Sequence, residues 1–330
     1  MTDQKIAIVT GANTGLGYET SLALARGGYK VVLACRNQDK AETAIKRIRQ
    51  KLSGSELDFM QLDLINRDSV KTSASMFSEK YKRLDLLVNN AGVMGPPHTI
   101  TENGLELQFD ANHVGHFLLT SRLMGCLEQS SDARIVNVSS LAGKWPSADI
   151  HFDNLNFEGN YESDHSVMGL PGFDAYCQSK LANILFSVEL HNRLTTANKD
   201  IKAFVVHPGA SNTNLPRHAS PVLRFILPVL VQFMNVSKPA QGAESTLLAA
   251  LGRDVKSGTF IGPTGKNGRT GKPGLCALPD QANDSALCAR LWQLSEELIG
   301  ETFNLNANSA STSGENYNPA IQNSIEGASQ

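Results

Sequence analysis

The sequence predicts a single doubly wound α/β domain, in which a parallel β-sheet carries helices on both faces. Short apolar runs rich in β-branched residues alternate with segments of helical periodicity from residue 6 onward. This alternation is typical of parallel strands joined by crossover helices. Three closely spaced glycines follow the first run and allow a tight turn from strand to helix. A length of 330 residues fits one large domain of this kind.

Composition and charge argue against several other classes of protein. Hydrophobic residues make up 41% of the chain and its net charge is -2, so nothing favours nucleic acid as a partner. The five cysteines are scattered without Cys-x-x-Cys spacing, which favours reduced thiols and no metal site. Residues 1–5 lead straight into an apolar strand and leave no room for a signal peptide. The longest apolar run, 222–234, is too short to span a bilayer, so we predict a cytoplasmic protein without a transmembrane segment.

The first strand and helix frame a candidate phosphate-binding turn. Residues 6–10 form an apolar run, and helical periodicity follows over 15–27. Backbone N–H groups at such a helix start can hold a pyrophosphate, although an ordinary glycine-containing turn has the same pattern. The candidate cofactor-binding residues here are Gly11, Asn13, Thr14, Gly15, Leu16 and Gly17.

The second strand, 30–35, indicates which dinucleotide would bind. In this fold the end of that strand lies over the adenosine ribose, where NAD-binding proteins place a carboxylate. Here Cys35 and Arg36 occupy the end, and no acidic residue precedes Asp39. An arginine suits a 2′-phosphate, so the sequence favours NADP(H) over NAD(H). The structural alternative is a surface arginine in a helix-preceding loop.

Polar and small residues also follow the later strands. The third strand, 57–64, ends in Asp63 and Leu64, and Asp63 is placed to contact an adenine ring. The fourth, 84–88, precedes Asn89, Asn90, Ala91 and Gly92, which suit contact with a flat ligand or simply a turn. Helical segments over 38–52 and 66–82 separate these strands.

A long helical stretch is predicted over 101–128, followed by three more strands. His113 and His116 in this stretch have no carboxylate or cysteine nearby to complete a metal site, so we interpret them as structural. The fifth strand, 133–140, ends in two hydroxyls. The sixth, 201–206, leads to Pro208, Gly209 and Thr213, and residues 258–261 form a seventh.

Tyr176 and Lys180 form the candidate acid/base pair. At positions i and i+4 of a helix, both side chains can reach one bound molecule. An ammonium about 4 Å from a phenol, at an effective dielectric constant of about 20, contributes roughly 4 kcal/mol, or about three pKa units. We therefore expect the pKa of Tyr176 to fall towards neutrality, where a general acid works best.

These motifs resemble the classical short-chain dehydrogenase/reductase family, which has a Rossmann-type sheet. The resemblance covers roughly residues 5–300. It rests on Gly11-x-x-x-Gly15-x-Gly17, Asn89-Asn90-Ala91-Gly92, Asn112, Ser140, Tyr176-x-x-x-Lys180 and Pro208-Gly209, which follow in the family order. Further stretches resemble the branch of retinol dehydrogenases, WW-domain oxidoreductases and protochlorophyllide reductases: 34–37, 112–117, 179–183 and 291–295.

The resemblance implies a catalytic tetrad of Asn112, Ser140, Tyr176 and Lys180. Tyr176 would donate a proton to the developing alkoxide, and Ser140 would hydrogen-bond the same oxygen. Lys180 would lower the pKa of Tyr176 and bind the nicotinamide ribose, while Asn112 would hold a water that relays protons. Family alignment selects Ser140 and leaves Ser139 as structural.

We divide the chain into an NADP-binding domain over 1–303 and a polar tail over 304–330, for which the composition predicts disorder. The insertion at about 145–173 resembles a substrate lid. Its Asp149, His151 and Asp153 are interpreted as solvated and not as a metal site. The apolar segment at about 212–236 suggests a lipophilic substrate or peripheral membrane contact, although a plain core helix has the same pattern. Residues 262–274 read as a flexible surface loop.

The sequence therefore predicts an NADP(H)-dependent oxidoreductase that interconverts a carbonyl and an alcohol on a small apolar molecule. Two other functions remain open: C=C reduction, as in the protochlorophyllide reductases, and a non-catalytic dinucleotide-bound sensor. The chain would be a monomer or a homodimer, since many relatives pair through the helices that carry Asn112 and Tyr176, whereas this branch includes monomers.

Overall fold

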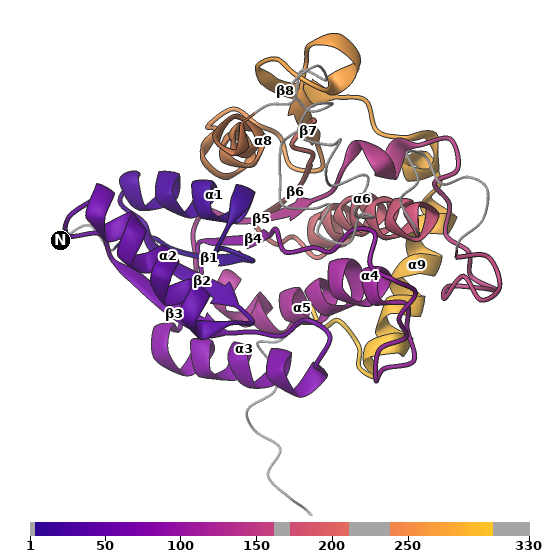
Figure 1. Cartoon of the computed structure of the whole chain (residues 1–330), viewed down its shortest axis with the longest axis horizontal. Coiled ribbons are helices and arrows are strands. Elements are labelled where there is room, and N and C mark those ends of the chain that lie inside the picture. Colours follow the sequence, from indigo (N-terminus) through magenta and orange to yellow (C-terminus); the bar gives the residue numbers. More distant parts are fainter. Residues whose placement is uncertain (1–3, 162–171, 211–237, 306–330) are drawn as a thin grey trace, which may run out of the picture.

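A computed structural model describes residues 4–161, 172–210 and 238–305. In these ranges the strands form an eight-stranded sheet of order β3-β2-β1-β4-β5-β6-β7-β8 (Figure 1). The strands span β1 Ile6–Thr10, β2 Lys30–Cys35, β3 Leu57–Gln61, β4 Leu86–Asn89, β5 Ala133–Val138, β6 Ile201–Val206, β7 Phe260–Pro263 and β8 Pro273–Cys276. All neighbouring pairs are parallel except β7 and β8. The predicted doubly wound fold is confirmed.

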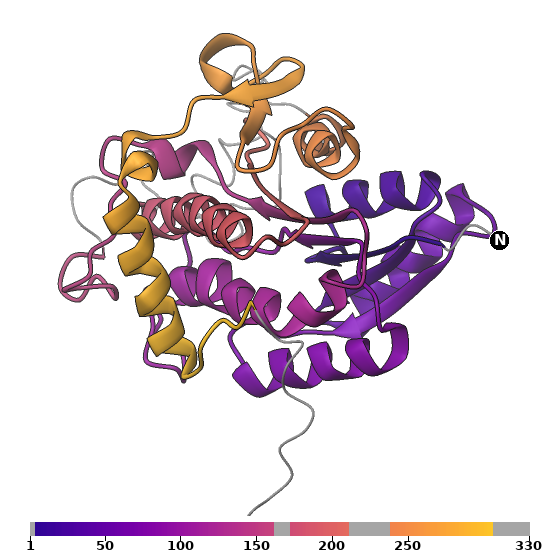
Figure 2. The ribbon, with the colours of Figure 1, turned by 180° about the vertical axis from the view of Figure 1, so that it is seen from behind.

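Helices cover both faces of the sheet, as Figures 1 and 2 show from opposite sides. One face carries α1 Gly15–Arg26, α2 Gln38–Lys51 and α8 Pro239–Leu251. The other carries α3 Arg67–Tyr81, α5 Gly115–Leu127, α6 Phe173–Thr196 and α9 Ser285–Ile299.

Alternating strand residues enter two separate cores because successive side chains of a strand point to opposite faces. In β1, Ala7 and Val9 belong to the core that includes residues of α1, α2 and α8, whereas Ile8 belongs to the core that includes residues of α3, α5 and α6. All three side chains are buried, which explains the continuous apolar run in the sequence.

The predicted helix over 101–128 is wrong in its first part. Ile100 instead pairs with Glu106 in an isolated antiparallel bridge, and regular helix begins only with α4, Leu107–Phe109. A π-helical turn, Asp110–Val114, then joins α4 to α5.

Residues 262–274, predicted as a surface loop, form the hairpin of β7 and β8. The N–H of Thr264 donates to the carbonyl of Lys272, and that of Gly265 donates to Thr270. The hairpin also docks on the turn after β6, where the N–H of Ala210 donates to the Arg269 carbonyl at 2.9 Å. Only the two ends of the segment belong to strands, and residues 264–272 are the largely exposed loop between them.

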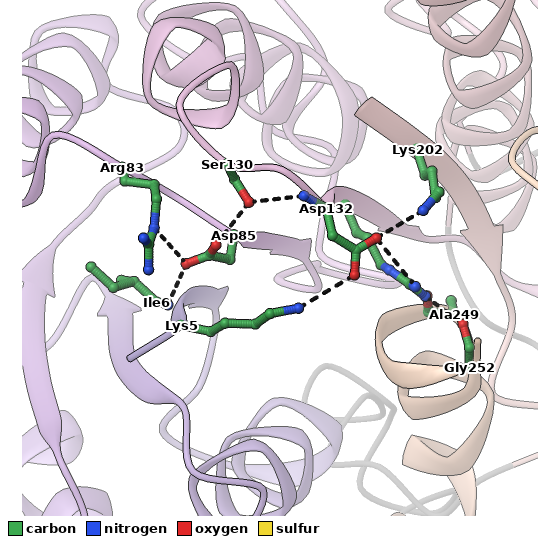
Figure 3. Close-up of polar contacts among 10 residues, drawn as sticks. Lys5, Ile6, Arg83, Asp85, Ser130, Asp132, Lys202, Ala249 and Gly252 are labelled. Carbon is green, nitrogen blue, oxygen red and sulfur yellow. Dashed lines mark hydrogen bonds and ion pairs between the residues drawn. The ribbon is translucent and has the colours of Figure 1, made fainter. Parts of the chain in front are cut away.

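A polar network closes the amino-terminal ends of the central strands (Figure 3). Buried Asp85 accepts hydrogen bonds from the N–H of Ile6 and the hydroxyl of Ser130. Asp132 forms ion pairs with Lys5, Lys202 and Arg134. These contacts join β1, β4, β5 and β6 at the edge opposite to their carboxyl ends.

Several predictions fall outside the described ranges. They concern Thr213, the segment at about 212–236 and almost all of the tail, while the insertion is described up to residue 161 and again from 172. Among the described helices, none has both the length and the apolar character that crossing a bilayer requires.

Candidate functional site

A cavity of about 1280 Å³ lies at the carboxyl ends of the parallel strands. It brings together all the predicted cofactor-binding residues that the structure describes. They are Gly11, Asn13, Thr14, Gly15, Leu16, Gly17, Arg36, Asp63, Leu64, Asn90, Ala91, Gly92, Tyr176, Lys180, Pro208 and Gly209. Ser140 also lines the cavity, whereas Asn112 lies behind its wall and contacts Val93.

The glycine-rich turn packs directly on the turn after β4. A Cβ on Gly11, where φ is +64°, would lie 3.0 Å from the Cα of Ala91. A Cβ on Gly17 would lie 2.5 Å from the carbonyl oxygen of Gly11 and 2.6 Å from the amide nitrogen of Asn90. Neighbouring atoms therefore come too close to both positions for any residue with a Cβ, so glycine is required there. A Cβ on Gly15, by contrast, would meet no atom within 4 Å, which leaves space at the positive end of the α1 dipole.

The adenosine end of the cavity is lined by Arg36 and Asp63. Arg36 is exposed, and its carbonyl accepts a hydrogen bond from the side-chain amide of Gln61 at 2.8 Å, which fixes its backbone. Because β3 ends at Gln61, Asp63 lies in the turn beyond the strand and not within it as predicted. Its Oδ1 accepts from the N–H of Ile65 at 3.3 Å.

Tyr176 and Lys180 lie one turn apart on α6, and both are buried. The Lys180 ammonium donates to the carbonyl of Val138 at 3.1 Å and lies 5.7 Å from the centre of the Tyr176 ring. Burial lowers the pKa of Lys180 to about 8.

The pKa of Tyr176 differs from the sequence-based expectation. Burial raises it to about 12, although the Ser140 hydroxyl acts in the opposite direction. Removing a phenolate from water costs free energy, and at a buried position this cost exceeds the effect of a nearby positive charge. Tyr176 is therefore protonated at neutral pH and suited to donate a proton.

Two adjacent serines after β5 have different surroundings. The Ser139 hydroxyl donates to the carbonyl of Lys180 at 2.7 Å and joins the strand end to α6. Ser140 faces the cavity, and its Oγ accepts from the N–H of Ala142 at 3.2 Å. This geometry agrees with a structural role for Ser139 and leaves Ser140 beside the Tyr176 hydroxyl.

Asn112 fixes the wall next to Lys180. Its side-chain oxygen accepts from the N–H of Val93 at 2.8 Å, and its amide donates to the Val93 carbonyl and the Ser179 hydroxyl, both at 3.0 Å. A Cβ on Gly92 would lie 3.2 Å from the Asn112 oxygen and 3.4 Å from the Lys180 nitrogen. Asn112 thus holds the turn after β4 against the helix that precedes α5.

The apolar part of the cavity was predicted only where the ends of the insertion at about 145–173 line it. Its lining includes Val93, Met94 and Leu107 from the connection after β4. Trp145 and Phe173 complete this part, with ring centres 5.7 Å apart in an edge-to-face arrangement. No periodicity marks the loop after Gly92, so only its position beyond a cofactor-binding turn could have indicated it.

The described part of the insertion is anchored beside this apolar wall. The Tyr161 hydroxyl donates to the Pro96 carbonyl at 2.9 Å, and the Gln108 amide donates to the Tyr161 oxygen at 3.1 Å and to the Gly172 carbonyl at 2.9 Å. Gly172 immediately precedes α6. Near the same tyrosine lies buried Glu106, whose pKa is raised by burial despite its hydrogen bonds. This network links the cavity rim to the start of the helix that carries Tyr176.

The candidate metal residues have other partners. Nε2 of His113 bonds to the Ser295 hydroxyl on α9 at 2.9 Å, in agreement with the predicted structural role. Asp149 accepts a hydrogen bond from the N–H of Ile150, and the N–H of His151 donates to Gln178. Within the described ranges, no three His, Cys, Asp or Glu residues gather as a metal site would require.

Comparisons with known proteins agree with this architecture. Residues 5–151 match the family model described as short chain dehydrogenase. Mouse retinol dehydrogenase 11 is 39% identical over 90% of this chain and 86% of its own length. Human retinol dehydrogenase 13 is 38% identical over 90% of this chain and 85% of its own length.

A solved structure shows the same relationship. The crystal structure of an uncharacterized protein from Mycobacterium paratuberculosis has a TM-score of 0.71 at 34% identity. The match covers 92% of this chain and 96% of that protein. Together with the retinol dehydrogenase relatives, this places the chain in the classical short-chain dehydrogenase/reductase family of oxidoreductases, in its retinol dehydrogenase branch.

Proposed function

We propose that the protein uses NADP(H) to interconvert a carbonyl and an alcohol on a lipophilic small molecule. One observation carries the proposal. Tyr176, Ser140 and Lys180 line a single cavity between the glycine-rich turn and the apolar wall of Met94, Trp145 and Phe173.

The polar part of the cavity fits a dinucleotide. The open space at Gly15 and the start of α1 suit a pyrophosphate. Arg36 at the end of β2 suits the 2′-phosphate of NADP(H), with no carboxylate between Arg36 and the start of α2 to favour an unmodified ribose. Lys180, which lines the same cavity, would hold the nicotinamide ribose.

The chemistry assigns one task to each residue. The nicotinamide supplies or accepts the hydride when bound. Tyr176, protonated at neutral pH, gives its proton to the oxygen that develops negative charge, and Ser140 donates a second hydrogen bond to that oxygen. In the oxidative direction the Tyr176 phenolate takes the proton of the alcohol. Because the pKa of Tyr176 is raised, the phenolate is the less populated form at neutral pH. Asn112 keeps the wall beside Lys180 in place.

Two lines support a lipophilic substrate. The wall next to Tyr176 is apolar and partly aromatic, and it could bury a hydrocarbon chain or ring. The names of the similar mouse and human proteins describe them as acting on retinol, a lipophilic alcohol.

A substrate panel with both dinucleotides tests the proposal. Purified protein would be mixed with NADPH or NADH and apolar aldehydes and ketones, and with NADP⁺ or NAD⁺ and the matching alcohols, while nicotinamide absorbance is followed. We expect turnover with NADPH and the bulky apolar aldehydes. Dinucleotide binding without any turnover would favour a sensor, and activity confined to conjugated C=C bonds would favour the reductase alternative.

A further inference from the structure

His116 connects two parts of the site from behind the cavity. It lies on α5, is buried, and does not line the cavity itself. Its Nε2 is 2.9 Å from the Thr10 hydroxyl, at the end of β1. Its Nδ1 is 3.0 Å from the backbone carbonyl of Asn112. One imidazole ring thus joins the dinucleotide side of the site to the segment that carries Asn112.

The hydrogen bonds around Thr10 determine where the imidazole proton lies. The Thr10 oxygen accepts from the N–H groups of Asn90 at 2.8 Å and Ala91 at 2.9 Å, which occupies its two lone pairs. Its own hydrogen is left to donate, and Nε2 of His116 at 2.9 Å is a closer acceptor than the carbonyl of Val88 at 3.4 Å. Nε2 therefore accepts, and the ring proton lies on Nδ1, where it donates to Asn112.

The Asn112 carbonyl that accepts from His116 lies in the π-helical turn. The N–H of Gly115 donates to Asp110, five residues earlier, and not to the residue four earlier as in an α-helix. The helical hydrogen bonds therefore shift register at this turn. Nδ1 of His116 bonds to the Asn112 carbonyl within it, so the imidazole ties the turn to α5. Burial lowers the pKa of His116 to about 4, so the ring is neutral and can accept and donate at once.

We propose that His116 is a positioning residue that holds two working parts in register: the Thr10–Ala91 turn, which shapes the dinucleotide site, and the Asn112 segment, which supports Lys180. The inference rests on the proposed function. Each hydrogen bond controls a different measurable property. The Thr10 bond supports dinucleotide affinity, and the Asn112 bond supports turnover.

Two substitutions separate the two bonds. In His116→Asn the side-chain amide nitrogen takes the place of Nδ1 and can still donate to Asn112, but nothing reaches Thr10. In His116→Gln an amide oxygen can reach the place of Nε2 and accept from Thr10, but the Asn112 carbonyl loses its donor. We expect His116→Asn to weaken NADPH binding about tenfold with kcat little changed. We expect His116→Gln to lower kcat about tenfold with NADPH affinity little changed.

The experiment measures the NADPH Kd by fluorescence titration, kcat with the best aldehyde of the panel, and Tm for each variant. His113→Asn and His113→Gln are matched controls, because His113 is buried three residues earlier and bonds to Ser295 outside the site. They should lower Tm without separating Kd from kcat. If NADPH affinity, kcat and Tm all fall in parallel in both His116 variants, the positioning role is wrong while the proposed function stands. The same holds if neither affinity nor kcat changes. A wild-type protein that binds neither dinucleotide would overturn both.

Discussion

The ammonium of Lys180 lies 3.1 Å from the carbonyl oxygen of Val138, at the carboxyl end of β5. This contact holds the side chain at the cavity, beside the place where the strand gives way to Ser139 and Ser140. This neutral acceptor compensates only part of the cost of burying an ammonium, so the pKa of Lys180 falls to about 8.

The depressed pKa of Lys180 predicts a pH dependence close to the physiological range. The charged form is needed to hold the ribose, and it is lost as pH rises through about 8. We expect kcat/KM for NADPH to be level below pH 7 and to fall about tenfold for each pH unit well above 8, since this parameter reports groups of the free enzyme. In Lys180→Arg the positive charge persists at high pH, so kcat/KM should no longer fall above pH 8, even if activity is lower. A wild-type profile that stays level to pH 10 would contradict the assignment.

Tyr176→Phe tests the proton donor. The substitution keeps the ring and removes the hydroxyl, so turnover should fall at least about a hundredfold while NADPH affinity changes little. Lys180→Ala should reduce both turnover and affinity, because one ammonium serves both. Steady-state kinetics and dinucleotide titration check these outcomes. Near-normal turnover of Tyr176→Phe would show that another group donates the proton.

Arg36→Glu tests the dinucleotide preference. Loss of a charge-assisted hydrogen bond and the added repulsion should weaken NADPH binding by roughly 2 kcal/mol or more, with NADH affected much less. Arg26→Glu is the matched control, because this exposed arginine lies at the other end of α1, away from the cavity. Titration of all three proteins with both dinucleotides gives the comparison. Tighter binding of NADH than of NADPH by the wild type would contradict the preference.

The fold was predictable because each central strand is short, apolar and bounded by glycine or polar residues. Ala7, Ile8 and Val9 show why, since both faces of β1 are buried and the run needs no alternation. β8 was not predictable in this way. Its residues include Pro273 and Gly274, which strands disfavour, and it is stabilised by pairing with β7 at the sheet edge.

The candidate site was predictable where chemistry demands particular residue types. Few other residues fit at Gly11 and Gly17, or at a Tyr and a Lys four residues apart, so these positions could be predicted from the sequence. The role of Val93 and Met94 could not be predicted from the sequence, since any apolar side chain can line the wall of a cavity. The pKa of Tyr176 was misjudged because burial, which decides it, is set by tertiary packing and not by the spacing of the motif.

The apolar wall predicts how activity depends on substrate length. Each buried methylene is worth about 0.8 kcal/mol, so two more carbons on an aliphatic aldehyde should raise kcat/KM roughly tenfold until the wall is covered. Met94→Ser should flatten this dependence without altering NADPH affinity. Met76→Ser is the matched control, because Met76 is 64% exposed on α3. A flat profile in the wild type would mean that the substrate does not use this wall.

The polar network at the amino ends of the strands predicts a loss of stability in acid. Burial pushes the pKa of Asp132 up, but the hydrogen bond from Lys202 and the charge of Arg134 outweigh it, so the pKa lies below its ordinary value of 3.8. A carboxyl group of this kind contributes its full stability above the unfolded-state pKa and loses it as pH falls through the folded-state pKa. Because Asp132 is a third exposed, its contribution is modest, and Asp132→Asn should lower Tm at pH 7 by about 1–3 °C.

Asp132→Asn should also change how Tm depends on pH in the acid range. The Tm difference between wild type and Asp132→Asn should be constant from pH 7 to about 5. It should shrink below about pH 4, where the carboxyl of the unfolded chain takes up a proton before the folded one, whose pKa is lower. Asp254→Asn, at an exposed aspartate outside the network, serves as the control and should follow the wild type throughout. Thermal unfolding at a series of pH values gives the three curves. A Tm difference that persists unchanged at pH 3 would mean that Asp132 stabilises the strand ends through its shape and neutral hydrogen bonds, and not through its charge.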